Sequence, residues 1–141
     1  MAVEAVVFFD SNYAKEFELR RKRGAHLFSK HRFLAAQMQA YLEGGLWIEM
    51  AQKANQACAQ LAHGLKKIPN VQLDFEPRAN MIFAHWTRAG HQRLHTAGAI
   101  YEVRAGDHTT GPTEELLPAR LVTDWSASAE SVDQFLNILQ G

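Results

Sequence analysis

The chain has 141 residues and a mass of 15.9 kDa, a length that fits one domain or a large piece of one. Lysine plus arginine number 15, as do aspartate plus glutamate, so the formal net charge is zero and a dedicated nucleic-acid binder is disfavoured. Hydrophobic residues make up 47% and charged residues 21%, a mixture that excludes wholesale disorder. The single cysteine, Cys58, excludes a disulfide framework within the chain and a cysteine-rich zinc site.

The hydrophobic segments indicate a cytoplasmic protein without membrane contact. No stretch approaches the roughly 20 apolar residues that a membrane span needs. At the N-terminus Glu4 interrupts the apolar residues, and the clean run Ala5–Phe9 is shorter than the apolar core of a signal peptide. The single cysteine agrees with a reducing compartment.

The N-terminal third is expected to contain one strand and two helices. Val3–Phe9 is apolar and rich in β-branched residues, as in a strand that is buried on both faces and needs neighbouring strands. Helices are expected over Tyr13–Arg23 and His26–Leu42. The first ends in the basic run Arg20–Arg23, which we interpret as a solvated helix end because the net charge is zero. The alternative is a surface that binds the phosphate of a nucleic acid or a cofactor.

A long central helix is the clearest prediction of the sequence. Apolar residues recur at steps of three and four from Leu46 to Ile68, which predicts an amphipathic helix about 34 Å long. Cys58 falls on this apolar stripe and has no basic neighbour in sequence. We therefore expect Cys58 to pack in the core rather than to react.

After Pro69 the hydrophobic period changes from that of a helix to that of a strand. The pattern predicts a small, mostly antiparallel sheet with helices on one face, an α+β arrangement. Strands are expected at Val71–Glu76, Met81–Trp86, Ala99–Val103 and Ala119–Asp124, and helices at Arg88–Thr96 and after a cap at Ser126 or Ser128.

Two groups of polar residues in this region are candidates for a site. His91 and His95 are four residues apart, so both could face one metal, but no third ligand is identifiable and we interpret them as surface histidines. Arg120 begins an apolar strand beside a long polar loop, where a guanidinium can present a planar fork to a carboxylate. The alternative for Arg120 is a salt bridge to Asp124 or Glu115.

An ordered set of short stretches resembles the C-terminal portion of the low-specificity L-threonine aldolases. That family belongs to the β-eliminating lyase group of fold-type-I enzymes that depend on pyridoxal 5′-phosphate (PLP). The resemblance covers nearly the whole chain, although no single motif is as specific as a metal-binding signature. The stretches are Glu4–Asp10, Arg21–Gly24, Leu27–Ala36, Asn80–Phe83 and Arg120–Thr123.

The resemblance implies a division of the chain into three parts. Residues 1–45 would be a remnant of the large PLP-binding domain, with the expected strand and two helices. Residues 46–70 would form a connecting helix, and residues 71–141 the C-terminal α+β small domain of a PLP-dependent transferase-like subunit. The family's Schiff-base lysine lies on a loop shortly before the strand that resembles Val3–Phe9, so it is expected outside this chain.

The implied reaction is retro-aldol cleavage of threonine or a related β-hydroxy-α-amino acid to glycine and an aldehyde. Arg120 resembles the arginine that holds the substrate carboxylate, and Lys22 lies where some members place a lysine that reaches the active site. Lys30, or less closely Arg32, lies near a basic residue that approaches the cofactor phosphate of a neighbouring subunit. No catalytic or metal-binding residue is assigned, and PLP is not expected to bind covalently to this chain.

Two consequences and two competing functions follow from this interpretation. The isolated chain is expected to be inactive, and its exposed strand and apolar helix faces are expected to drive homo-oligomer formation or aggregation. The main alternative is a non-catalytic α+β module for oligomerisation or binding. A nucleic-acid binder acting through Arg20–Arg23 is a more distant alternative, and it predicts salt-dependent retention of DNA.

Overall fold

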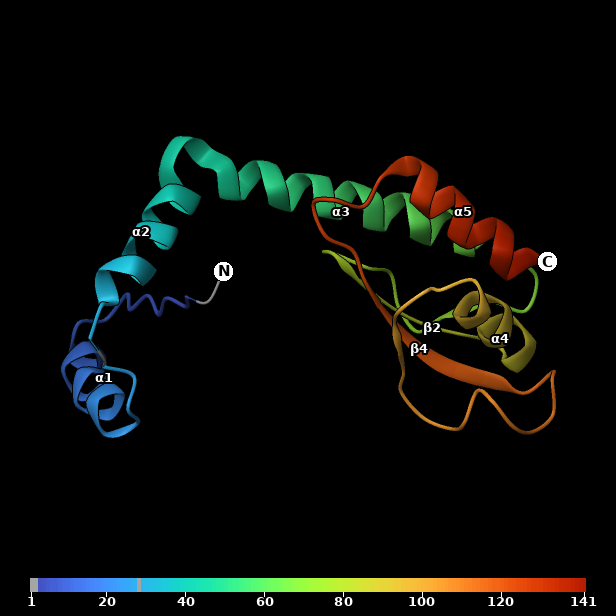
Figure 1. Ribbon diagram of the computed structural model, residues 1–141, viewed down its shortest axis with the longest axis horizontal. Helices are drawn as coiled ribbons and strands as arrows, with labels where there is room; N and C mark the ends of the chain where they lie inside the picture. Colours follow the sequence, from blue (N-terminus) through green and yellow to red (C-terminus); the bar gives the residue numbers. More distant parts are fainter. Residues whose placement is uncertain (1–2, 28) are drawn as a thin grey trace. The chain divides into compact units, whose positions relative to one another are not determined.

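The computed structural model describes residues 3–27 and 29–141 (Figure 1). The chain divides into two compact units, Met1–Trp47 and Ile48–Gly141. The N-terminal unit holds the helices α1 (Asn12–Arg23) and α2 (His31–Leu42), followed by the short 3-10 turn η1 (Glu43–Gly45). The long helix α3 (Leu46–Leu65) starts there and lies almost wholly in the C-terminal unit.

The strand expected over Val3–Phe9 is not formed. Residues 3–8 have no regular secondary structure, and Val7 and Phe9 are exposed. A strand needs a partner whose backbone pairs with its own, and the sheet contains no strand from this part of the described chain. The second helix starts at His31, later than expected, because Lys30 adopts left-handed backbone angles with φ 68°. Phe28, within the expected helix, lies outside the described residues.

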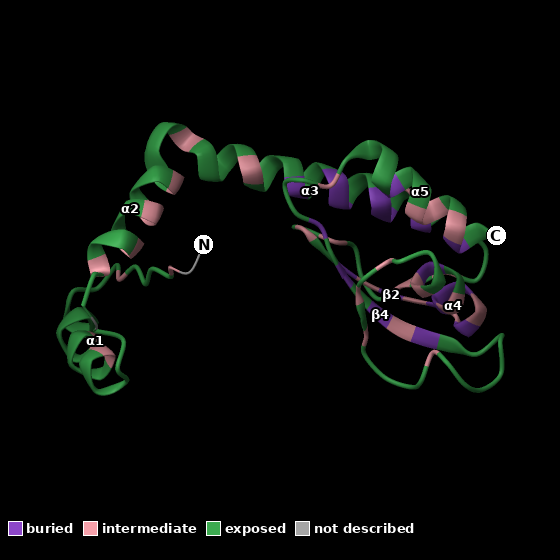
Figure 2. Ribbon diagram, in the orientation of Figure 1, coloured by how far each residue is buried: buried purple, intermediate pink, exposed green. Residues whose placement is uncertain are grey.

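The N-terminal unit has no core of its own among its described residues. None of them is buried, and the fully buried side chains begin at Ala54 (Figure 2). Side-chain contacts in this unit are local, as between the rings of Phe8 and Phe17, whose centroids are 5.1 Å apart. Helices of twelve residues are marginal in water without packing partners.

The C-terminal unit is built on an antiparallel four-stranded sheet with the strand order β1-β2-β4-β3. The two long strands lie in the centre, and the two edge strands have only two residues each, shorter than expected. Short edges limit the backbone that is open to pairing with another chain. The strands are β1 (Gln72–Leu73), β2 (Met81–Thr87), β3 (Glu102–Val103) and β4 (Leu116–Val122), and two further helices are α4 (Arg88–Thr96) and α5 (Ala129–Gln140).

Alternation along the central strands separates a core face from an open face. On β2, Ile82, Ala84 and Trp86 are buried, and each pairs with a buried residue of β4. Helices α3, α4 and α5 contribute to the same core, so all three cover one face of the sheet, as expected. The core members from the helices are Cys58, Leu61, Ala62, Leu65, Leu94, Val132 and Leu139.

The predicted position of Cys58 in the core is confirmed, since its side chain is 1% exposed. Two helices of the C-terminal unit have side-chain caps, α4 at Thr87 and α5 at one of its two expected positions. The hydroxyl of Thr87 accepts a hydrogen bond from the N–H of Gly90 at 3.2 Å, and Ser128, rather than Ser126, accepts one from the N–H of Ser131 at 3.2 Å. None of the described helices combines the length and apolar character needed to cross a bilayer.

Candidate functional site

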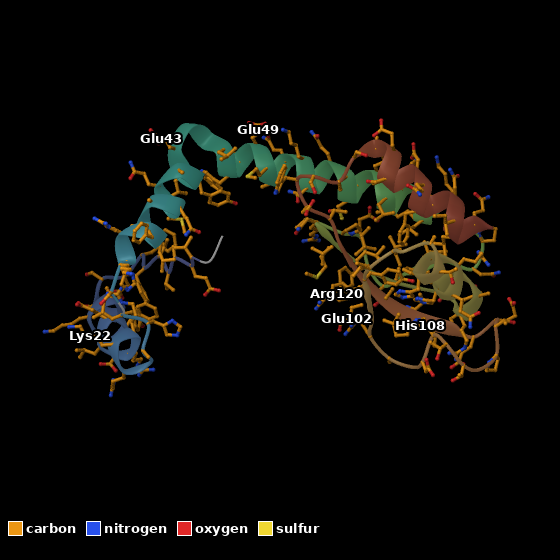
Figure 3. The ribbon with its side chains drawn as sticks, viewed as in Figure 1. Lys22, Glu43, Glu49, Glu102, His108 and Arg120 are labelled. Carbon is orange, nitrogen blue, oxygen red and sulfur yellow. The ribbon has the colours of Figure 1, made fainter. Side chains whose placement is uncertain are left out.

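Arg120 lies on the open face of the sheet, near the end of the central strand β4. Its Nη2 is 2.6 Å from Oε2 of Glu102, which is its register partner on the edge strand β3 (Figure 3). The alternative prediction of an ion pair to Asp124 or Glu115 is therefore wrong, because the register places Glu102 beside Arg120 on the same face. The Arg120 side chain is 44% exposed, so solvent and small anions can reach its guanidinium.

A second arginine lies on the same face. Phe83 on β2 is the register partner of Arg120 on the other side, and the Cζ atom of Arg104 lies 4.9 Å from the centroid of the Phe83 ring. The open face thus carries two arginines, Arg120 paired with Glu102 and Arg104 over the Phe83 ring, and both are cations that can attract an anion. Further along the face, Nδ1 of His85 is 2.9 Å from Oδ1 of Asp74.

Lys22 and Lys30 lie in the N-terminal unit, and both are exposed. Lys22 is in the last turn of α1 (Figure 3), and Lys30 precedes the first residue of α2. Arg32, the less favoured alternative to Lys30, lies with its Cζ 5.1 Å from the ring of Phe33. The roles given to these three residues by resemblance stay predictions.

The basic run at the end of α1 is partly paired within its own helix. Glu16 Oε1 is 3.0 Å from Nε of Arg20 and 3.3 Å from Nη2 of Arg23. All three side chains are largely exposed. This arrangement agrees with a solvated helix end, and exposed pairs of this kind contribute little to stability.

His91 is fully buried, so the prediction that it lies on the surface is wrong. Its Nε2 donates to the carbonyl oxygen of Leu117 at 3.1 Å, and its Nδ1 then accepts from the hydroxyl of Tyr101 at 2.9 Å. The ring stacks on Trp86 with centroids 4.6 Å apart. Burial lowers the pKa of His91 to about 4. The spacing of His91 and His95 could not reveal this burial, because it does not show which face of α4 packs on the sheet.

Two further histidines, His95 and His108, extend the group of rings formed by Trp86, His91 and Tyr101. The ring of His95 stacks on Tyr101, with centroids 4.6 Å apart, and lies tilted against the ring of His108, with centroids 4.2 Å apart. Burial lowers the pKa of His95 and raises that of Tyr101. Within residues 3–27 and 29–141 no group of three or more His, Cys, Asp or Glu side chains is arranged to hold a metal ion.

A buried arginine that sequence reasoning missed holds the long loop before β4. Arg88, 3% exposed, forms an ion pair with Glu115, and its Nε donates to the carbonyl oxygen of Pro112 at 3.1 Å. The same loop is ordered by Asp107, which accepts hydrogen bonds from the Thr109 hydroxyl and backbone N–H and from the Thr110 hydroxyl. These bonds lower the pKa of Asp107 to about 2.

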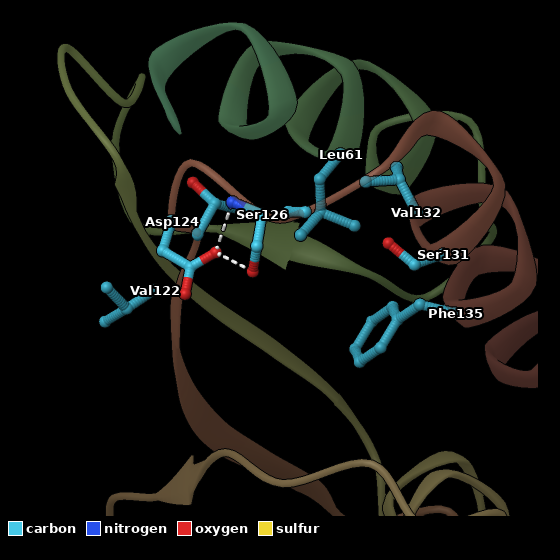
Figure 4. A pocket seen from close by; sticks show the side chains of 9 residues that line it. Leu61, Val122, Asp124, Ser126, Ser131, Val132 and Phe135 are labelled. Carbon is cyan, nitrogen blue, oxygen red and sulfur yellow. Dashed lines mark hydrogen bonds between the residues drawn. The ribbon is translucent and has the colours of Figure 1, made fainter. Parts of the chain in front are cut away.

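A shallow pocket of about 360 Å³ lies between α3, α5 and the segment that follows β4 (Figure 4). Its polar groups already have partners within the chain. Ser126 bonds to Asp124 through both its N–H and its hydroxyl, which lowers the Asp124 pKa, and the Ser131 hydroxyl donates to the carbonyl of Ser128. Arg120 does not line this pocket. The open face around Arg120 is therefore the better candidate site.

Comparison with known proteins identifies the relatives of this chain. No family model matches it. The low-specificity L-threonine aldolase of Pseudomonas sp. (strain NCIMB 10558) is 40% identical over 100 residues, which cover 70% of this chain and 29% of that protein. The low-specificity L-threonine aldolase of Pseudomonas aeruginosa is 31% identical over 133 residues, 94% of this chain and 36% of that protein. The chain is a homologue of part of these threonine aldolases. It spans about a third of their length.

Solved structures show the same fold as this threonine aldolase homologue. The Leishmania major threonine aldolase has a TM-score of 0.64 at 19% identity, over 79% of this chain and 30% of that one. The cystine C-S lyase C-DES has a TM-score of 0.57 at 20% identity, over 76% and 28% of the two chains. These likenesses and the small antiparallel sheet with its helices confirm the predicted fold class, except for the strand expected before the long helices, which is not formed.

Each unit carries an exposed cation of the kind that binds an anionic group, but the described residues of neither unit enclose a cofactor. In the C-terminal unit Arg120 presents a reachable guanidinium, a group that can bind a carboxylate, and in the N-terminal unit Lys30 is an exposed cation. Neither the pocket beside Asp124 nor a second shallow pocket on α4, lined by Gln92 and Arg93, is lined by Arg120 or by a lysine. The residues present thus do not by themselves enclose PLP.

Proposed function

We propose that this chain is the C-terminal part of a PLP-dependent lyase that cleaves threonine or related β-hydroxy-α-amino acids to glycine and an aldehyde. Its contribution is the clamp for the substrate carboxylate. Homology to two low-specificity L-threonine aldolases supports the reaction. The observation that carries the clamp is the reachable guanidinium of Arg120 on the central strand of the sheet.

The position of Arg120 suits a group that must orient a substrate. Strand β4 pairs with β2 on one side and with β3 on the other, so the backbone of Arg120 is held from both sides. A guanidinium fork binds both oxygens of a carboxylate and thereby fixes the direction of the bonds at the adjacent carbon. PLP, when bound, supplies the electron sink for the carbanion that bond cleavage leaves.

The covalent anchor of PLP is proposed to come from outside these 141 residues, with Lys30 near the cofactor phosphate and Lys22 near the substrate. The exposure of the N-terminal unit supports the proposal that it packs against another surface, because none of its described residues is buried. Large apolar side chains such as Val7, Phe9 and Tyr13 are exposed there. We propose that they pack against the rest of such an enzyme or against a second copy in a homo-oligomer.

The cytoplasmic location stays a prediction, based on the single cysteine and the absence of a long apolar segment from the sequence. The alternative function, a non-catalytic oligomerisation module, would also explain the exposed apolar side chains. It differs in giving Arg120 no role, so a test of Arg120 separates the two.

The test uses the chain alone and a chimera. Incubated with PLP and threonine, the isolated chain should release no glycine or acetaldehyde. A chimera in which this chain replaces the matching segment of the Pseudomonas aeruginosa relative should cleave threonine. In that chimera Arg120→Lys, which removes the fork but keeps the charge, should lower kcat/KM by about 100-fold.

Arg78→Lys is the matched control, because Arg78 is an exposed arginine of the same unit that lies in the turn before β2. It should leave kcat/KM of the chimera unchanged. Robust turnover by the isolated chain would refute the proposal that the lysine that anchors PLP lies outside these 141 residues. An Arg120→Lys chimera as active as its parent would refute the carboxylate clamp.

A further inference from the structure

Glu102 and Arg120 are brought together by the sheet itself. They are register partners across β3 and β4, so their side chains leave the backbone side by side on the open face. Their charged atoms, Oε2 and Nη2, are 2.6 Å apart (Figure 3). The strand pairing therefore places a carboxylate at Arg120 before any ligand arrives.

The same donor cannot serve two carboxylates with full strength. A substrate carboxylate that binds the Arg120 fork needs the Nη groups, and Glu102 already occupies one of them. We propose that Glu102 is a built-in competitor for the substrate carboxylate, holding Arg120 when the site is empty and leaving when substrate binds. This inference rests on the proposed function, since it concerns the regulation of that same site.

Glu102 can be displaced from Arg120 because the ion pair is partly exposed to solvent. The side chains of Arg120 and Glu102 are 44% and 47% exposed, so water and salt screen their attraction. Exposed ion pairs of this kind are weak, so competition from Glu102 should weaken the binding of a carboxylate to Arg120 by only about 1.5-fold to fivefold. A buried pair would instead block the site, so the observed geometry supports tuning rather than inhibition.

The displaced carboxylate also has a place to go. Glu102 belongs to a two-residue edge strand, so its side chain can rotate toward solvent. Arg104, two residues further along the chain and beside Phe83, offers a second cation on the same face. Release of Glu102 therefore does not leave an isolated buried charge.

The test measures binding of acetate, the simplest carboxylate, to the 141-residue chain. Acetate replaces chloride at constant ionic strength, and the Nε–H signal of Arg120, assigned by its loss in Arg120→Lys, is followed by NMR. Glu102→Gln keeps the shape of residue 102 and removes its charge. We expect the apparent Kd for acetate to fall by about 1.5-fold to fivefold in Glu102→Gln.

Two controls separate competition from a general change in charge. Asp74→Asn removes one negative charge from the same open face, where Asp74 pairs with His85. Glu49→Gln breaks an exposed ion pair to Lys53 on α3, whose charged atoms are 2.7 Å apart. Both variants should bind acetate with the wild-type Kd.

The outcomes distinguish this inference from the proposed function. If all variants bind acetate at Arg120 equally, or if Asp74→Asn strengthens binding as much as Glu102→Gln, the competitor is refuted while the clamp survives. If no variant binds acetate at Arg120, the competitor is refuted and the clamp with it. None of these results depends on cleavage of threonine.

Discussion

Acid should destabilise the C-terminal unit through His91. The pKa of His91 is lowered from 6.5 to about 4 in the folded chain, chiefly by burial, so between these values the unfolded chain binds more protons than the folded one. The contribution of neutral His91 to the free energy of unfolding is therefore fully present above about pH 6.5 and is lost as the pH falls toward 4. The loss amounts to about 2 kcal/mol by pH 5 and about 3 kcal/mol by pH 4.

That loss is large beside the roughly 5–15 kcal/mol by which a typical domain is stable. Urea titrations at pH 7.5, 6, 5 and 4 measure it directly. Tryptophan fluorescence suits the assay because Trp86 is 1% exposed, whereas Trp47 and Trp125 are 44% and 56% exposed, so Trp86 senses loss of the core most strongly. NMR titration of the His91 ring checks the cause.

The matched variants are His91→Gln, which removes the titrating group, and His63→Gln, which changes an exposed histidine of α3. His91→Gln should flatten the fall in stability between pH 6.5 and 4, and the slope that persists includes His95 and, toward pH 4, carboxylates with lowered pKa values such as Asp107. His63→Gln should keep the wild-type slope. A His91 ring that titrates near pH 6.5 in the folded chain would refute this reasoning.

Two further predictions concern packing and helix capping. A Cβ at Gly64 would overlap the side chain of Leu136, which costs about 1–3 kcal/mol, and the roughly 0.5–1 kcal/mol that alanine gains over glycine inside α3 offsets part of this. Gly64→Ala should therefore lower the free energy of unfolding by up to about 2 kcal/mol, and Leu136→Ala in the same chain should remove part of that cost. Urea unfolding of the two single variants and the double variant measures the coupling, and strict additivity would contradict the overlap. Ser128→Ala removes the cap of α5 and should cost about 0.5–2 kcal/mol, whereas Ser126→Ala should cost less because Ser126 caps no helix. Thermal unfolding compares them, and equal losses would argue against the cap.

The sequence predicts the central elements of the fold well because their signals are local. The apolar period between Leu46 and Ile68 marks α3, alternation marks β2, and Thr87 marks the start of α4. The edge strands are shorter than their apolar patterns suggest, because strand length depends on pairing with β2 and β4. Val3–Phe9 has a strand-like composition but no partner among the described strands.

The sequence predicts Arg120 as the main residue of the candidate site but not the side chains that surround it. Arg120 stands out as a cation within an apolar stretch, and the resemblance gives it a role, although it lies near the end of β4 rather than at the start of a strand as expected. Its partner Glu102 is eighteen positions away, across a long loop, so only the register of β3 against β4 reveals it. Likewise, the burial of His91 depends on Tyr101 and Leu117, which approach it from other elements.

The confinement of buried side chains to residues from Ala54 onward divides the chain into regions under different evolutionary constraints. Substitutions in the C-terminal unit are filtered by the fit of its own core. In the N-terminal unit, apolar residues such as Phe9 and Phe33 are retained only while something outside the described core selects for them. If that external surface were lost, these positions would drift toward polar residues while the sheet and its three helices stayed recognisable.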